Sequence, residues 1–311
     1  MIDSLGSSNN PDIFIDRGQR MSSEHYLSIP EAALSMQEYI ASTDQNVFAS
    51  RGLQKFKEMD NKALEGTICL PTTTLMALRH MGQSEVLNLA DFYELGVLTH
   101  VNDRADRLGN NQKGYPSFHR RSLDTYLRYA LEFSKVAGLS GGIITQFDDL
   151  NFVYPVIAEG GLVIVSFDNL FIPDVMNKSL DRSTFKISRH AELVHGKLGG
   201  DLLISDTKNK KKEITWNPRN VVVPRAEMEK YLTCPRLNDG LTRAIVLTTD
   251  AVTWANLLER LRSFGKVEDN GFNPILKPHF GKGVKGALGL VREIAEKGNA
   301  EWDMFEPKTD K

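Results

Sequence analysis

Cysteine, long apolar runs and an excess of either charge are all scarce in this chain of 311 residues. The two cysteines, Cys69 and Cys234, are too few for a disulfide scaffold or a zinc site built from thiolates, so each is expected to be a free thiol. No segment approaches the roughly 20 apolar residues that span a bilayer, and the N-terminus lacks the basic and apolar regions of a secretory signal. These absences predict a soluble cytoplasmic protein without a membrane partner.

Charge gives no sign of a nucleic-acid partner. The formal net charge is -2, charged residues make up 25% and hydrophobic residues 41% of the chain, which is ordinary for a globular protein. A nucleic-acid binder would be expected to carry a basic excess. The local lysine run within Lys208–Lys212 is interpreted as a solvated turn.

The chain divides into three parts by composition. Residues 1–24 are rich in Ser, Asn and Asp and are expected to form a flexible N-terminal arm. Residues 25–234 contain the candidate chemistry and are expected to form the main domain. After Pro235 the pattern changes, and residues 235–311 are expected to form a C-terminal α/β extension packed on that domain.

Periodicity predicts helices and strands in an α+β arrangement, with a helical portion packed on an antiparallel sheet. A turn-rich stretch, His100–Ser117, is expected to be a surface loop. The expected helices are Pro30–Ser42, Gln54–Leu64, Pro71–Met81, Ser122–Ala137, Asp148–Glu159, Ala251–Phe264 and Val284–Lys297. The expected strands are Leu162–Phe167, Ile187–His195, Leu202–Asp206, Glu213–Trp216 and Ala244–Thr248.

Cys69 is the candidate nucleophile because of where it stands. It lies just before the helix that Pro71 opens and Gly82 ends. The unpaired N–H groups and positive end of a helix favour thiolate over thiol. A lone cysteine is nevertheless more often a core residue, and that alternative stays open. Cys234 precedes Pro235 in a loop-like stretch and is interpreted as structural.

A thiolate that acts on acyl groups needs a basic partner, and His190 and Asp206 are the best-placed pair. If they face each other across a hairpin, its centre falls on residue 198, within the glycine-rich Gly196–Gly200. Cross-strand neighbours of this kind are close enough for a carboxylate to orient an imidazole. His195 is an odd number of residues from His190, so strand alternation places it on the other face and we interpret it as structural. Asp206 by itself would be an ordinary strand-end residue.

Three segments resemble the papain-like peptidases that process double-glycine leader peptides, and their phytochelatin synthase relatives. Thr67–Leu78 resembles the stretch that carries the family's cysteine, and Asp148–Val165 resembles its helix leading to a buried strand. The third likeness, to the family's histidine hairpin, is carried by Arg189–Val194 and Leu203–Asp206. The resemblance covers roughly residues 62–232.

The resemblance implies a papain-like cysteine peptidase fold with a Cys69, His190 and Asp206 triad in that order along the chain. Two positions depart from the family. Ala63 stands where a glutamine usually supplies an oxyanion-hole donor, and Leu70 replaces the usual glycine after the nucleophile. The oxyanion-hole residues are therefore left unassigned. Loss of one such donor can lower the reaction rate by a factor of about 10²–10³. A thioester substrate is already activated, so its reaction would depend less on that donor.

The chemistry expected of this triad is acyl transfer through a thioester on Cys69. With water as acceptor, the protein hydrolyses an amide or peptide bond. With an amine as acceptor, it is a transglutaminase-like amide synthase or an acyltransferase, acting on an activated thioester that a carrier protein could hold. A catalytically inactive papain-like module that binds a peptide or a carrier protein is the second alternative.

No cofactor and no metal is expected. Gly281–Gly286 satisfies the Gly-x-Gly-x-x-Gly pattern, but no strand precedes it, which argues against a dinucleotide site. The start of the following helix could still hold a phosphate through its N–H groups. His80, His100 and His119 lack the short spacing of a zinc site.

Overall fold

The computed structural model describes residues 25–26, 46, 53, 68–83, 85–100, 123–168, 189–206, 221–229 and 243–297. Several sequence-based expectations lie outside these residues. They are the arm at 1–24, the helices at 30–42 and 54–64, the loop from 101 to 117, the strand at 213–216, and Cys234.

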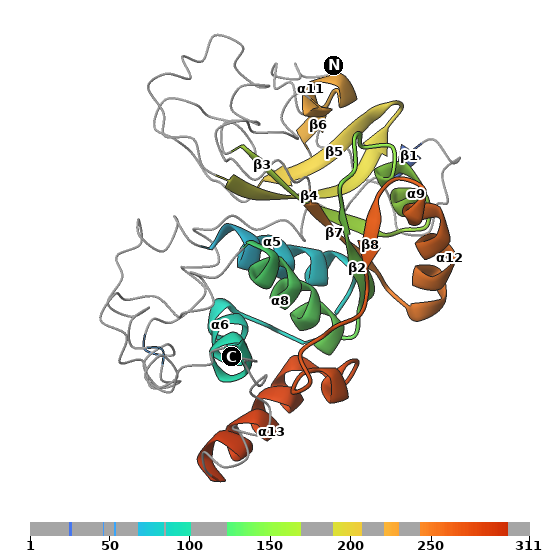
Figure 1. Cartoon of the computed structure of the whole chain (residues 1–311). Coiled ribbons are helices and arrows are strands. Elements are labelled where there is room, and N and C mark those ends of the chain that lie inside the picture. Colours follow the sequence, from blue (N-terminus) through green and yellow to red (C-terminus); the bar gives the residue numbers. More distant parts are fainter. Residues whose placement is uncertain are drawn as a thin grey trace, which may run out of the picture.

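One antiparallel sheet organises the described part of the chain (Figure 1). The strand order is β6-β5-β4-β3-β7-β2-β8, and the short β1 pairs with β4 beside this path. Every pairing in the sheet is antiparallel. The strands are β1 His25–Tyr26, β2 Ser140–Thr145, β3 Leu162–Asp168, β4 Arg189–Leu198, β5 Asp201–Asp206, β6 Val221–Val223, β7 Arg243–Thr248 and β8 Lys266–Glu268.

Helices cover both faces of the sheet, which explains why its central strand is apolar on both sides. In β3, Ile164 packs in one hydrophobic cluster and Val165 in the other. The first cluster joins the sheet to α5 Cys69–His80, α6 Leu89–His100, α8 Leu123–Val136 and α13 Val284–Lys297. The second joins it to α9 Val153–Ala158 and α12 Ala251–Arg262 (Figure 1). The expectation of a buried central strand at 162–167 agrees with this arrangement.

The last quarter of the chain is built into the sheet. Strand β7 lies between β3 and β2, and its residues Ile245 and Val246 pack in opposite clusters. Helix α13 packs through Val291 into the same core as α5, α6 and α8. The segment expected to form a C-terminal α/β extension, 235–311, thus supplies strand β7 to the middle of the sheet. Sequence alone does not show this, because strand order is set by long-range pairing.

The bounds of several elements differ from the sequence-based expectation. Helix α9 begins at Val153 rather than near Asp148, because the preceding residues form turns in which Asp149 accepts a hydrogen bond from the Asn151 N–H at 2.7 Å. Side chains of this type compete with helix for the backbone. Gly160, with φ of 72°, follows the C-cap Glu159, so α9 stops near its predicted end. Strand β2, with Gly141 and Gly142 in its first half, and helix α6 were not expected.

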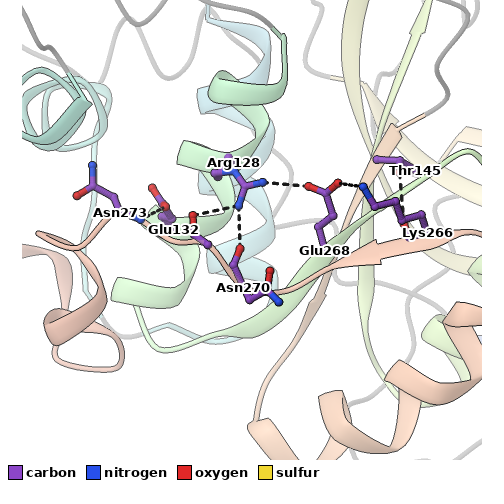
Figure 2. A network of polar contacts seen from close by, with 8 residues as sticks. Arg128, Glu132, Thr145, Lys266, Glu268, Asn270 and Asn273 are labelled. Atoms are coloured by element: carbon purple, nitrogen blue, oxygen red, sulfur yellow. Dashed lines mark hydrogen bonds and ion pairs between the residues drawn. The ribbon is translucent and has the colours of Figure 1, made fainter. Parts of the chain in front are cut away.

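A polar network ties β8 and the segment after it to α8 (Figure 2). Arg128 donates to the Asn270 oxygen at 2.8 Å and to the Glu268 carboxylate at 2.9 Å. Glu132, one turn later, accepts a hydrogen bond from the backbone of Asn273 at 2.7 Å. The network joins residues 268–273 to α8.

Among the helices in the described segments, none is both long and apolar enough to cross a membrane. The described residues thus form an α+β protein with an antiparallel sheet, as the sequence predicted.

Candidate active site

Cys69 is the first residue of α5 rather than the residue before it. The N-cap position is Ile68, whose side chain cannot accept a hydrogen bond, and the first turn contains no acidic residue. The N–H groups of that turn are therefore left to other acceptors. The Cys69 side chain is half-buried, whereas almost all of α5 from Leu70 to Leu78 is buried, so the helix presents its sulfur at the edge of the core.

The hairpin that carries His190 and Asp206 differs in register from the expectation. Its turn is Gly199-Gly200, and Asp206 pairs directly with Glu192 rather than with His190. The pairing shifts by one residue between Val194 and Gly196, where a bulge interrupts the ladder. The expected centre at residue 198 was therefore wrong, because it assumed that His190 and Asp206 lie directly opposite each other, whereas the turn is centred between residues 199 and 200.

His190 and Asp206 nevertheless meet, as diagonal neighbours. Glu192 and His190 are two residues apart, so they share a face of β4, and Asp206 shares that face through its pairing with Glu192. The His190 Nε2 lies 2.5 Å from the Asp206 Oδ1, and both side chains are buried. The nitrogen left for any other partner is consequently Nδ1.

That remaining nitrogen faces the nucleophile candidate, because His190 is hydrogen bonded to Cys69. Burial alone would lower the pKa of the His190 imidazole, but the charge and hydrogen bond of Asp206, assisted by Cys69, raise this pKa to about 10. Burial would likewise raise the pKa of the Cys69 thiol, but the hydrogen bond and charge of His190 lower it below its usual value. The arrangement thus favours a thiolate and imidazolium pair.

The backbone of Ala191 joins the nucleophile helix to the histidine strand. Its N–H, together with that of Leu70, donates to the Cys69 sulfur and lowers the pKa of the thiol further. Its carbonyl oxygen lies 3.0 Å from the Thr73 hydroxyl, which also lies 2.9 Å from the carbonyl oxygen of Cys69. One buried hydroxyl therefore bridges the first turn of α5 and the residue after His190.

A second acid, Glu192, belongs to the same cluster. His190, Glu192 and Asp206 are all buried and each offers a ligand-type atom within 4.8 Å of those of the other two. Residues of these types can hold zinc, but two ligand atoms on a tetrahedral zinc are separated by about 3.3 Å. The 2.5 Å between Nε2 and Oδ1 is a hydrogen-bond distance and leaves no room for an ion between those atoms.

His195 lies on the other face of β4, as strand alternation predicts. Its Nε2 lies 3.0 Å from the Ser205 hydroxyl, and its ring centre is 5.6 Å from that of His80, in the last turn of α5. Burial and then the nearby His80 lower the pKa of His195 well below its usual value. His195 is therefore a neutral buried histidine, at the opposite end of α5 from Cys69.

Two tyrosines belong to the same part of the core as Cys69. Tyr126 of α8 is partly buried and packs, as Cys69 does, against the first hydrophobic cluster, while Tyr93 of α6 is fully buried in it. Burial raises the pKa of Tyr126 well above its usual value, and the neighbouring Tyr93 and Cys69 raise it further. The Tyr126 phenol is therefore neutral, a hydrogen-bonding group in the surroundings of Cys69.

The Gly281–Gly286 motif has a structural role in this protein. The N–H groups of Val284 and Lys285, at the start of α13, donate to the two carboxylate oxygens of Glu85 at 2.7 and 3.3 Å. The N–H groups considered for a phosphate at this helix start are thus engaged by a side chain of the protein itself.

A scan against protein-family models finds no match to this chain, and a search of curated proteins finds no significant one. The geometry around Cys69 is therefore the basis for assigning a function.

The sequence indicated Cys69, His190 and Asp206, and the structure brings these three together. Sequence reasoning missed Thr73 and Glu192. An available signal was the run Thr72–Thr74, which begins three residues after the cysteine, since three buried threonines in a helix are unusual where straight-chain apolar residues are favoured. Glu192 also stands out as an acid within an otherwise apolar part of β4.

Proposed function

We propose that this protein is a papain-like cysteine enzyme that transfers acyl groups through a thioester on Cys69, with hydrolysis of an amide or peptide bond as its reaction. The observation that supports this most is the continuous contact of Cys69 with His190 and of His190 with Asp206, in a site where the pKa of the thiol is lowered and that of the imidazole is raised.

In the first half of the reaction, the Cys69 thiolate attacks the carbonyl carbon of the substrate and forms a C–S bond. The His190 imidazolium gives its Nδ1 proton to the leaving nitrogen, the C–N bond breaks, and an amine departs. Asp206 holds Nε2 throughout and stabilises the imidazolium between these steps.

In the second half, neutral His190 accepts a proton from water as the water oxygen attacks the thioester carbon. The C–S bond then breaks, which releases a carboxylic acid and restores the thiolate and imidazolium pair. In this mechanism the Cys69 backbone N–H, in the first turn of α5, donates to the oxygen that gains negative charge in both halves. An amine in place of water would give an amide synthase or acyltransferase.

Alkylation of Cys69 tests the proposal without knowledge of the substrate. Iodoacetamide is added at pH 6 to 7 and labelled peptides are quantified by mass spectrometry, with Cys234 as the internal reference. We expect Cys69 to react at least tenfold faster than an ordinary thiol at this pH and to lose that advantage in His190→Gln. A Cys69 that reacts no faster in the parent than in His190→Gln would contradict the proposal.

Acyl transfer itself is tested with small thioesters and activated esters as probes. A mass increase on Cys69 equal to the acyl group is expected, followed by release of the acid in water. In a solution that contains a primary amine, the product mass separates hydrolysis from amide formation. Turnover that persists in Cys69→Ala would exclude the mechanism.

A further inference from the structure

The backbone of Ala191 lies one position beyond the last pair of a ladder. Strand β5 ends at Asp206, which pairs with Glu192, and Ala191 is the next residue of β4. In an antiparallel strand the N–H and the carbonyl of one residue point to the same side. The Ala191 carbonyl oxygen lies 3.0 Å from the Thr73 hydroxyl, so the Ala191 N–H also faces the first turn of α5. The helix thus takes the place beside β4 that β5 leaves at this end.

The sulfur of Cys69 is the atom that these backbone groups reach. It accepts hydrogen bonds from the Ala191 N–H and from the Leu70 N–H. Leu70 is the second residue of α5, where the N–H groups of the first turn have no acceptor within the helix, and Pro71 after it has no N–H to offer. One donor from a strand and one from a helix therefore meet at the atom that forms and breaks a bond in the proposed reaction.

The strength of these two hydrogen bonds follows the charge on the sulfur. A hydrogen bond to an ionised acceptor is roughly twice as strong as one between neutral groups. The sulfur carries a full charge as the thiolate, almost none as part of a thioester, and regains its charge when the thioester breaks. Donors fixed on the sulfur therefore stabilise the step in which the C–S bond breaks more than the step in which it forms.

We propose that the Ala191 and Leu70 N–H groups are catalytic donors that stabilise the Cys69 sulfur as the leaving group of the second half of the reaction. The inference rests on the proposed function. Water attacks the thioester carbon and gives one proton to His190. The C–S bond then breaks, its electron pair stays on the sulfur, and the two N–H groups bind the thiolate as the carboxylic acid departs.

Removal of a single N–H tests this inference in the full-length protein. Lactic acid incorporated at position 191 replaces the amide of Ala191 with an ester, which keeps the methyl side chain but has no N–H. Leucic acid at position 70 makes the same change at Leu70. The matched control is the corresponding ester at Leu193, whose N–H lies on the same side of β4 but faces β5, where Leu193 pairs with Ser205. A thermal unfolding midpoint is recorded for each protein.

Three quantities are measured with iodoacetamide and with a small thioester: the thiol pKa, the alkylation rate on the high-pH plateau, and the hydrolysis rate of the acyl-enzyme. In the Ala191 ester the thiol pKa should rise by about one unit and hydrolysis should slow about tenfold, because the departing thiolate has lost one donor. Plateau alkylation should be up to about threefold faster, since a thiolate of higher pKa is more nucleophilic. The Leu70 ester should change all three quantities in the same directions, and the Leu193 ester should keep them close to the parent values.

The expected pattern is specific to a donor on the leaving sulfur. Plateau alkylation that slows as much as hydrolysis, or the same losses in the Leu193 ester, would show a general disturbance of the site and overturn the inference. An unchanged acyl-enzyme lifetime in the Ala191 ester would also overturn it. A parent protein that forms no acyl-enzyme with any probe refutes the proposed function and the donor role together. A parent that turns over with a lifetime that the Ala191 ester does not change refutes the donor role alone.

Discussion

The hydroxyl of Thr73 lies 3.0 Å from the backbone carbonyl oxygen of Ala191, a contact between residues 118 positions apart in the chain. The same hydroxyl lies 2.9 Å from the Cys69 carbonyl oxygen within α5. Because Ala191 follows His190 directly and its N–H donates to the Cys69 sulfur, this contact sets the distance between nucleophile and base. Geometry of this kind matters because small misplacements of reacting groups lower rates by large factors.

Thr73→Val should therefore slow Cys69 alkylation at pH 7 by about tenfold while lowering the free energy of unfolding by only about 1–3 kcal/mol, the cost of an unsatisfied buried carbonyl. Thr74→Val is the matched control. Thr74 is buried in the same turn region, but its hydroxyl bonds only to the Leu70 carbonyl within α5, at 2.8 Å. Thr73→Ser should keep most of the parent rate. Equal slowing in Thr73→Val and Thr74→Val would argue against a link between helix and strand.

The His190 imidazolium should make stability depend on pH in a defined direction. The folded-state pKa is raised to about 10 from an ordinary value of 6.5, so the folded state binds the proton more tightly than the unfolded state. The resulting stabilisation is fully present below pH 6.5 and is lost as the pH rises toward 10. Urea unfolding of Cys69→Ser and of Cys69→Ser with His190→Gln at pH 6, 8 and 10 measures it. The difference between the two proteins should shrink steadily as the pH rises, and a constant or growing difference would refute the assignment.

Glu85 should hold α13 against the rest of the protein. Its carboxylate accepts hydrogen bonds from the Val284 and Lys285 N–H groups, and so caps a helix that is 199 residues away in the chain. Glu85→Ala should lower the free energy of unfolding by about 1 kcal/mol, with faster amide exchange in the first turn of α13. Glu85→Gln keeps an acceptor but loses the charge that favours a helix N-terminus, so an intermediate effect is expected. Parent-like exchange in Glu85→Ala would show that the cap contributes nothing.

Local signals explain why much of the fold could be predicted. Helix α13 has the predicted bounds, and α8 differs from the prediction by one residue at each end, because capping signals and apolar spacing agree at these positions. Strand β3 was recognised from a short apolar run between glycine and turn residues. Strand β2 was missed because Gly141 and Gly142 are poor strand formers. Both positions nevertheless require glycine, because neighbouring atoms approach them too closely for a side chain. A Cβ on Gly141 would lie 2.0 Å from the Val246 oxygen of β7.

The candidate site was predictable in its residues but not in its register. Cys69, His190 and Asp206 could be chosen from helix position and hairpin spacing, which are local properties. The bulge between Val194 and Gly196 could not be predicted, and it makes Glu192 rather than Leu193 the direct partner of Asp206, which places Asp206 on the same face of the sheet as His190. Thr73 could not be assigned a partner either, since its contact with Ala191 depends on how α5 packs on β4.

The central place of β7 has a consequence for synthesis of the chain. Strand β3, the inner neighbour of the histidine strand, has an open edge until residues 243–248 emerge from the ribosome and fill it. Because pairing between distant segments is slow and late in folding, a nascent chain that already contains Cys69, His190 and Asp206 still lacks the middle of its sheet. The thiol would then gain its reactivity only after β7 has been synthesised and has paired with β3.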